Sequence, residues 1–131
     1  MRRQAREEVL RLLYRQEYLP PSLGDLDNDE DPVPIGFARD LLAGVHAHRT
    51  EIDSIIDRRA LGWGLDRLPM VDRNILRLAL YELLYTDTPA EVVMDEAVEL
   101  AKSYGTDHAP AVINGILDRV RKERDATSPM G

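Results

Sequence analysis

Apolar residues recur every three to four positions along almost the entire chain, and no segment shows the period-two alternation of a half-buried strand. This pattern predicts an all-helical fold, because each apolar stripe must be buried against another helix. The predicted helices cover residues 3–19, 35–48, 50–61, 69–85, 88–104 and 108–124, and residues 65–68 add a short turn. With 131 residues and no cysteine, the chain is long enough for one ordinary core without disulfides.

Local turn chemistry predicts where several of these helices begin and end. Thr50 is expected to cap the helix that it opens. Thr88 is expected to cap a later helix, with Pro89 at the first helical position and Glu91 closing a capping box. Gly105 is expected to end that helix in the left-handed conformation that favours glycine.

The helices are expected to form one domain over residues 1–124, followed by a flexible tail at 125–131. Residues 22–34 carry five acidic side chains and few apolar ones, which predicts an exposed acidic loop. No segment approaches the roughly 20 apolar residues that span a bilayer, and the first residues lack the apolar core of a signal peptide. The sequence therefore predicts a soluble, cytoplasmic protein.

Charge is distributed unevenly along the chain. The formal net charge is −7, so the overall field does not favour nucleic acid. Residues 1–15 nevertheless hold five arginines against two glutamates. Arg2, Arg3 and Arg6 stand where the first helix begins, a position at which positive charge opposes the helix dipole. The residues alone leave two interpretations open, a solubilising terminus and a phosphate-binding arm.

The residue types that carry catalysis or bind metals do not form a recognisable pattern. His46 and His48 point about 200° apart on a helix and cannot share a metal ion, and His108 lies far away in the sequence. The glycine-rich stretch at 62–64 lacks the Lys-Ser/Thr that follows in a phosphate-binding loop. We therefore expect no enzymatic activity and no metal, nucleotide or other cofactor.

Two further features suit either the core or an interface. Tyr14 and Tyr18 lie one helical turn apart, as do Tyr81 and Tyr85, and tyrosine fits both a half-buried core position and a contact with a partner. Gly115 lies inside the last predicted helix, where glycine costs about 1 kcal/mol relative to alanine. That cost indicates close helix packing or the approach of another chain.

Several stretches, taken in order, resemble the NusB family of bacterial transcription antitermination factors. They are Arg3-Gln-Ala-Arg-Glu with Leu13-Tyr14; Arg39-Asp-Leu-Leu-Ala-Gly-Val; Asp72-Arg-Asn-Ile-Leu-Arg-Leu-Ala-Leu-Tyr-Glu-Leu; Glu96-Ala-Val-Glu-Leu-Ala-Lys-Ser-Tyr-Gly; and Asn114-Gly-Ile-Leu-Asp. Together they cover most of residues 2–120. The resemblance implies six to seven helices in two packed three-helix sub-bundles. It also implies binding of boxA-type single-stranded RNA in ribosomal RNA transcripts, with the small-subunit ribosomal protein NusE, in an RNA polymerase antitermination complex.

The resemblance also assigns roles to individual residues. It implies RNA binding by Arg2, Arg3, Arg6 and Asp118. It places Tyr14 and Glu82 toward NusE. Gln4 interrupts the arginine arm, and Ala111-Val112 stands where the family often has an aromatic residue. Together with the net negative charge, these departures predict weak RNA binding by the chain alone and a need for the basic ribosomal partner.

Two other classes of protein stay open at this point. Some RNA cytosine methyltransferases carry a NusB-like domain at their N-terminus, and a chain continuing past Gly131 would favour such an enzyme. Some NusB-type proteins self-associate, so a homodimeric scaffold that has lost RNA binding is the second alternative.

Overall fold

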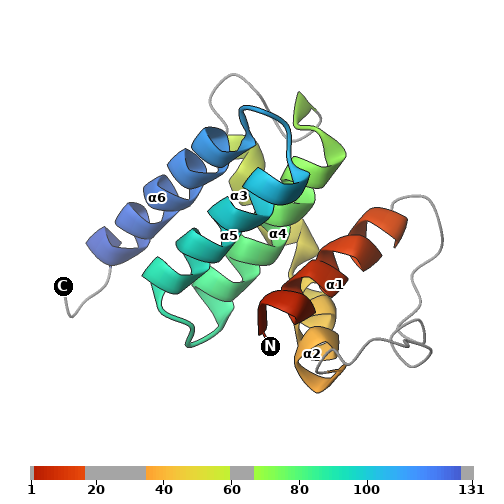
Figure 1. The fold of residues 1–131 in the computed structure, drawn as a ribbon. Helices are drawn as coiled ribbons and strands as arrows, with labels where there is room; N and C mark the ends of the chain where they lie inside the picture. Colours follow the sequence, from red (N-terminus) through yellow and green to blue (C-terminus); the bar gives the residue numbers. More distant parts are fainter. Residues whose placement is uncertain (1, 17–34, 60–66, 128–131) are drawn as a thin grey trace.

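The computed structural model describes residues 2–16, 35–59 and 67–127, which form α-helices and no strand (Figure 1). The helices are α1 (Arg2–Gln16), α2 (Ile35–Ala47), α3 (Arg49–Arg59), α4 (Met70–Tyr85), α5 (Ala90–Tyr104) and α6 (Ala109–Thr127). The all-helical prediction is confirmed. The acidic loop at 22–34, Tyr18 and residues 65 and 66 of the short turn lie outside the described residues.

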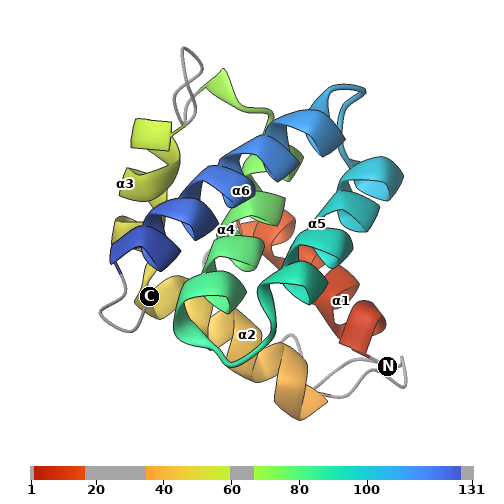
Figure 2. The same cartoon turned by 90° about the vertical axis from the view of Figure 1, so that its left-hand side faces the viewer.

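Helix α4 lies at the centre of the fold and contacts each of the other five described helices. Helices α5 and α6 pack against α4 and against each other, which forms one three-helix sub-bundle (Figure 2). Helices α1 and α2 pack together on another side of α4, and α3 follows α2 and also reaches α6. The two predicted sub-bundles are therefore present. Helix α4 contacts the helices of both, and most of its residues are buried.

The predicted apolar stripes form the core. On α1, Ala5, Val9 and Leu12 are fully buried. The stripe of α3 is likewise buried at Ile52 and Ile56. Each such valine, leucine or isoleucine side chain contributes roughly 1.5–3 kcal/mol when it leaves water, so helical spacing alone accounts for much of the packing. None of the described helices is both long and apolar enough to cross a membrane.

The predicted capping box at the start of α5 is wrong. The helix begins at Ala90, its cap position is Pro89, and no side chain caps it. The Thr86 hydroxyl instead donates to the Glu82 carbonyl at 2.7 Å and accepts the Thr88 backbone N–H at 3.3 Å. The threonines therefore close the end of α4, which precedes them, rather than the start of α5. Thr50 also lies inside α3 rather than before it.

Gly105 ends α5 as predicted, but in an extended conformation with φ −84° and ψ 178°. Glycine suits this position because the backbone lies close to neighbouring atoms, and not because the residue adopts a left-handed conformation. A Cβ at this position would lie 2.7 Å from the Ala109 Cβ and 3.0 Å from Asp72 Oδ1. The neighbouring Thr106 donates its backbone N–H and its hydroxyl to the buried Asp72 carboxylate, at 3.2 Å and 2.7 Å. The turn before α6 is thus fixed to α4.

Helix α6 runs to Thr127, three residues beyond the predicted end at Arg124. Arg124 donates from Nη1 to the carbonyl of Leu83 at 2.9 Å, which holds this part of α6 against α4. The helix therefore continues for three residues past the point at which Arg124 holds it to α4. Residues 128–131 of the predicted tail lie outside the described residues.

Candidate nucleic-acid interface

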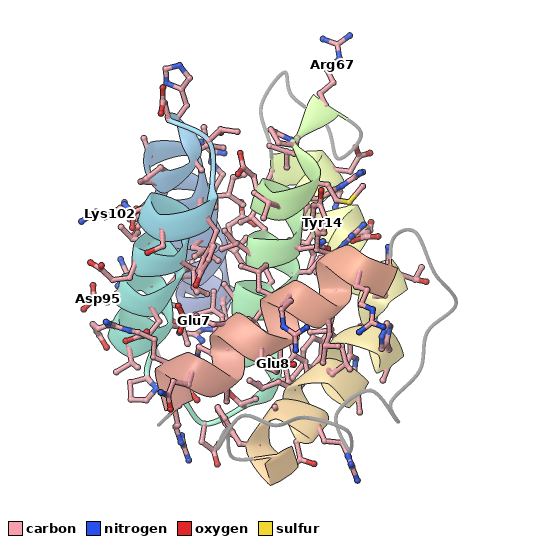
Figure 3. The ribbon with its side chains drawn as sticks, turned by 45° about the vertical axis from the view of Figure 1, so that its right-hand side comes forward. Glu7, Glu8, Tyr14, Arg67, Asp95 and Lys102 are labelled. Carbon is pink, nitrogen blue, oxygen red and sulfur yellow. The ribbon has the colours of Figure 1, made fainter. Side chains whose placement is uncertain are left out.

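The arginine arm, defined here as Arg2, Arg3 and Arg6, occupies the first two turns of α1. Figure 3 shows α1 crossing in front of α4, with Glu7 on the side toward α5. The Tyr104 hydroxyl of α5 donates to Glu7 at 2.7 Å, which links α1 to α5 at this point. The arm precedes Glu7 on α1, at the point where α1, α2 and the start of α5 line one hollow.

Arg3 is held in place by an acidic residue of α5. Its Nε and Nη2 donate to the two carboxylate oxygens of Glu96, both at 2.9 Å. The hydrogen bond from Arg3 lowers the pKa of the Glu96 carboxyl, and the same bond raises the pKa of Arg3. The Arg3 side chain is still 57% exposed, so a ligand can reach its outer face.

Arg6 and Glu82 form a second bidentate pair, and this pair is buried. Both N–O distances are 2.7 Å, and the two side chains are only 4% and 2% exposed. The hydrogen bond that Arg6 donates to Glu82 raises the pKa of Arg6. The family resemblance assigns these two residues to different partners, RNA and NusE. The structure instead brings them together and presents neither side chain at the surface.

Arg2 carries its charge over an aromatic ring. Its guanidinium carbon lies 4.6 Å from the centroid of Phe37, a residue of α2, which is the geometry of a cation–π contact. Phe37 is half-buried, and its ring reaches the arm. Nothing local in the sequence predicts this contact, because it depends on how α1 lies beside α2.

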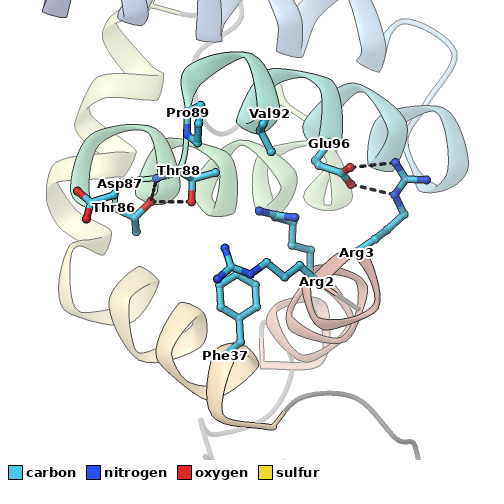
Figure 4. Close-up of a pocket in the computed structure, with 10 residues that line it drawn as sticks. Arg2, Arg3, Phe37, Thr86, Asp87, Thr88, Pro89, Val92 and Glu96 are labelled. Atoms are coloured by element: carbon cyan, nitrogen blue, oxygen red, sulfur yellow. Dashed lines mark hydrogen bonds and ion pairs between the residues drawn. The ribbon is translucent and has the colours of Figure 1, made fainter.

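A hollow of about 800 Å³, which we term the arm hollow, opens beside these arginines (Figure 4). The three arginines and Phe37 line one part of it. Residues 86–89 of the α4–α5 turn, with Val92 and Glu96 of α5, line the rest. Among the described residues, Val92 is one of four large apolar or aromatic side chains that remain exposed, at 43%.

A second hollow, of about 740 Å³, lies on the other side of Arg3. It reaches across α5 to the first turns of α6 and is lined there by Ala111 and Asn114. The structure thus brings the arm and part of the Asn114-Gly-Ile-Leu-Asp motif to one surface. Asp118, one turn further along α6, lines neither hollow.

Asp118 is paired with two cations of its own helix. Arg121 Nη2 donates to Oδ1 at 2.7 Å, and Lys122 Nζ lies 3.0 Å from Oδ2. The hydrogen bond from Arg121, followed by that from Lys122, lowers the pKa of the Asp118 carboxyl. Gly115 on the same helix is exposed, and a Cβ built on it meets no atom within 4 Å. Packing within the described residues therefore does not explain this glycine.

The tyrosines divide between core and surface. Tyr81 packs against Gly44 of α2, where the glycine leaves room for the ring. Tyr85 stacks on His48 with 3.8 Å between ring centroids, and its hydroxyl donates to Glu51 at 2.6 Å. That hydrogen bond raises the pKa of Tyr85 to about 12. Tyr14 is 44% exposed on α1, well separated along the helix from the arm.

Comparison with known proteins gives a consistent result. The family model for the NusB family matches residues 3–122. A transcription antitermination protein NusB of Myxococcus xanthus is 42% identical over 130 residues, covering 91% of this chain and 93% of the relative. The corresponding protein of Trichlorobacter lovleyi is 45% identical over 127 residues, covering 92% of this chain and 89% of the relative.

Solved structures agree with the sequence comparison. The structure of T. maritima NusB superposes with a TM-score of 0.84 at 42% identity, covering 94% of this chain and 92% of that chain. A complex of the antitermination factors NusB and NusE with double-stranded RNA contains a chain with a TM-score of 0.78 at 29% identity. That match covers 93% of this chain and 96% of the other.

Proposed function

The chain belongs to the NusB family, and we propose that it is a transcription antitermination factor. In this role it binds boxA-type single-stranded RNA of ribosomal RNA transcripts together with NusE, as part of an RNA polymerase antitermination complex in the cytoplasm. It acts as an adaptor rather than an enzyme. The relatives that match over about nine-tenths of their own length are named antitermination proteins, which supports this over the methyltransferase alternative.

The observation that carries the proposal is an exposed pair of arginines in an acidic chain. Arg2 and Arg3 are exposed at one end of α1, whereas the net charge of the whole chain is −7. Phosphate binding is therefore confined to a local patch, with Arg2 and Arg3 as its contact residues. Arg6 is buried against Glu82 and serves as a positioning residue that fixes the direction of the arm.

The basic partner NusE supplies the positive charge that the chain lacks. Tyr14 offers an exposed aromatic ring on α1 for that contact. Glu82 is buried and acts on NusE binding indirectly, by holding Arg6 and with it the position of α1. Asp118 contributes on the RNA side through Arg121 and Lys122, whose cationic groups it orients.

The test is RNA binding measured by fluorescence anisotropy, with a boxA-type oligonucleotide, a scrambled single strand and a duplex, each with and without NusE. We expect selective binding of the boxA-type strand that tightens when NusE is added. Two phosphate contacts on a single strand, one for each exposed arginine, predict a log–log salt slope of about −1.4. Equal, weak binding to all three RNAs with NusE present would contradict the proposal.

A homodimeric scaffold is the second candidate function. Asn114 and Gly115 are both exposed on α6, and a Cβ at Gly115 would meet no atom within 4 Å. This part of α6 therefore leaves room for another chain. Sedimentation with and without the boxA-type oligonucleotide separates the two functions. A dimer that RNA leaves unchanged would favour the scaffold.

A further inference from the structure

The arm hollow combines an aromatic ring, a cation and an apolar side chain in one cavity. Its volume of about 800 Å³ lies within the roughly 300–1,000 Å³ typical of sites for small molecules. Figure 4 shows Phe37 and Arg2 on one side, with Thr88, Pro89 and Val92 on the facing side. A cavity with two facing walls of this kind suits a flat ligand that also carries a negative charge.

The first wall offers a stacking surface. The ring of Phe37 packs against the hydrophobic core, so its position is fixed by the fold. The guanidinium carbons of Arg2 and Arg6 lie 4.6 Å and 5.7 Å from the ring centroid. Single-stranded RNA is recognised largely by stacking its bases on aromatic rings and on guanidinium planes. The Phe37–Arg2 wall provides both kinds of surface.

The facing wall offers an apolar contact beside a hydroxyl. Val92 is 43% exposed and its side chain points into the hollow (Figure 4). The hydroxyl of Thr88 contacts Thr86 Oγ1 at 3.2 Å, which leaves hydrogen-bonding capacity, because a hydroxyl has one donor and two lone pairs. An apolar contact suits the face of a base, and a hydroxyl suits its polar edge.

The charges in the hollow favour a phosphate. Glu96 is engaged by Arg3, and the carboxylate of Asp87 points away from the cavity (Figure 4). Arg2, in contrast, makes no ion pair with any of the residues that the structure describes. Its cation therefore remains available to a ligand, and the exposed face of Arg3 lies beside it.

We propose that the arm hollow binds one nucleotide of single-stranded RNA, with its base between the Phe37–Arg2 wall and Val92 and its phosphate on the outer edges of Arg2 and Arg3. This inference rests on the proposed function and locates a base-binding site next to the arm. Phe37, Thr88 and Val92 belong to none of the motifs that carry the family resemblance. Their role follows only from the way α2 and the α4–α5 turn approach α1.

The first test compares Phe37→Leu with Tyr85→Leu in the anisotropy titration with the boxA-type oligonucleotide. Tyr85 is an exposed aromatic residue of α4 that does not line the hollow, and its ring and hydroxyl contact His48 and Glu51, so it is a matched control. Loss of one stacked base predicts five- to tenfold weaker binding for Phe37→Leu and no change for Tyr85→Leu. The salt slope should stay the same for both, because no phosphate contact is removed.

A second measurement does not depend on altering the core. In wild-type protein, the methyl resonances of Val92 and Thr88 should shift when the oligonucleotide is added, while those of the buried Ile56 should not. The exposed-site variant Val92→Ser should bind about threefold more weakly with an unchanged melting temperature. These two results keep the proposal testable even if Phe37→Leu fails to fold.

The proposal is overturned if wild-type protein binds the boxA-type strand while Val92→Ser binds equally well and the Val92 and Thr88 resonances do not move. That outcome leaves the antitermination function intact. If wild-type protein shows no selective RNA binding with or without NusE, both the proposed function and the nucleotide site are wrong.

Discussion

Arg6 and Glu82 lie 76 residues apart in the sequence and meet as a buried bidentate ion pair, with both N–O distances at 2.7 Å. The pair joins the start of α1 to the last turns of the central helix α4. A charge buried in this way is tolerated only while its partner is present. The orientation of the arginine arm is therefore tied to the core of the protein.

Breaking this pair on one side should destabilise the fold. We expect Glu82→Ala to reduce the free energy of unfolding by about 3–5 kcal/mol, because it leaves the Arg6 guanidinium buried and uncompensated. Chemical denaturation measures the change. The double variant Arg6→Met with Glu82→Met should recover most of the loss, since an apolar pair of similar volume is often neutral or stabilising.

The matched control for that experiment is Glu99→Ala, which removes a glutamate from the exposed Lys102 pair on α5. Surface pairs contribute about 0–1 kcal/mol, so this variant should unfold almost as the wild type does. If Glu82→Ala were no more destabilising than Glu99→Ala, the buried pair would have no structural role.

Glu96 competes with RNA for Arg3. Its carboxylate occupies Nε and Nη2 of Arg3, so a phosphate must displace it or share the guanidinium. We expect Glu96→Gln to tighten binding of the boxA-type oligonucleotide about threefold and to steepen the salt slope by about 0.7, as for one added phosphate contact. Anisotropy titrations across a salt series measure both.

Glu123→Gln controls for the change in net charge, because Glu123 pairs with Arg59 and lies outside both hollows. It should leave the salt slope unchanged. Equal tightening by both variants would mean that net charge, rather than release of Arg3, governs the affinity.

The same pair makes a prediction about acid pH. Arg3 lowers the pKa of Glu96, so in the folded state this carboxyl should protonate below the roughly 4.3 of an ordinary glutamate. A depressed folded-state pKa gives a stabilisation that is present above the unfolded value and is lost as the pH falls through the folded one. A carbon-detected NMR titration of Glu96 measures the midpoint. In Arg3→Gln that midpoint should rise toward the ordinary value, and no rise would show that another group causes the shift.

Much of the fold could be predicted because helical periodicity is a local property. The stripe of Ala5, Val9 and Leu12 needs only correct spacing to indicate a helix and its buried face. The Arg6–Glu82 pair could not be predicted in this way. A charged residue within a helix is normally expected at the surface, and the burial of this pair depends on how α1 crosses α4.

The errors at helix ends have a similar cause. Thr88 fits the capping box by spacing, but Thr86 is also present and closes α4 by a hydrogen bond to the Glu82 carbonyl. Local rules cannot decide between two adjacent helices that compete for the same short turn. The contact between Phe37 and Arg2 likewise exists only once α1 and α2 are packed.

Two glycines inside helices should respond in opposite ways to alanine. At Gly44, a Cβ would overlap the Tyr81 ring, which itself lies in the stack with His48 and Tyr85. We expect Gly44→Ala to destabilise the protein by about 1–3 kcal/mol, as overpacking does, because the ring must leave its place. Thermal unfolding followed by circular dichroism measures the change.

Gly115→Ala is the matched substitution on α6, where the added methyl group meets nothing within 4 Å. It should stabilise the isolated chain by up to about 1 kcal/mol, through the higher helix propensity of alanine. If another chain approaches α6 at this point, the same methyl group should weaken that association while it raises the melting temperature. Sedimentation and NusE titration of Gly115→Ala would therefore show whether the glycine serves an interface. Stabilisation with unchanged association would exclude an interface role for this position.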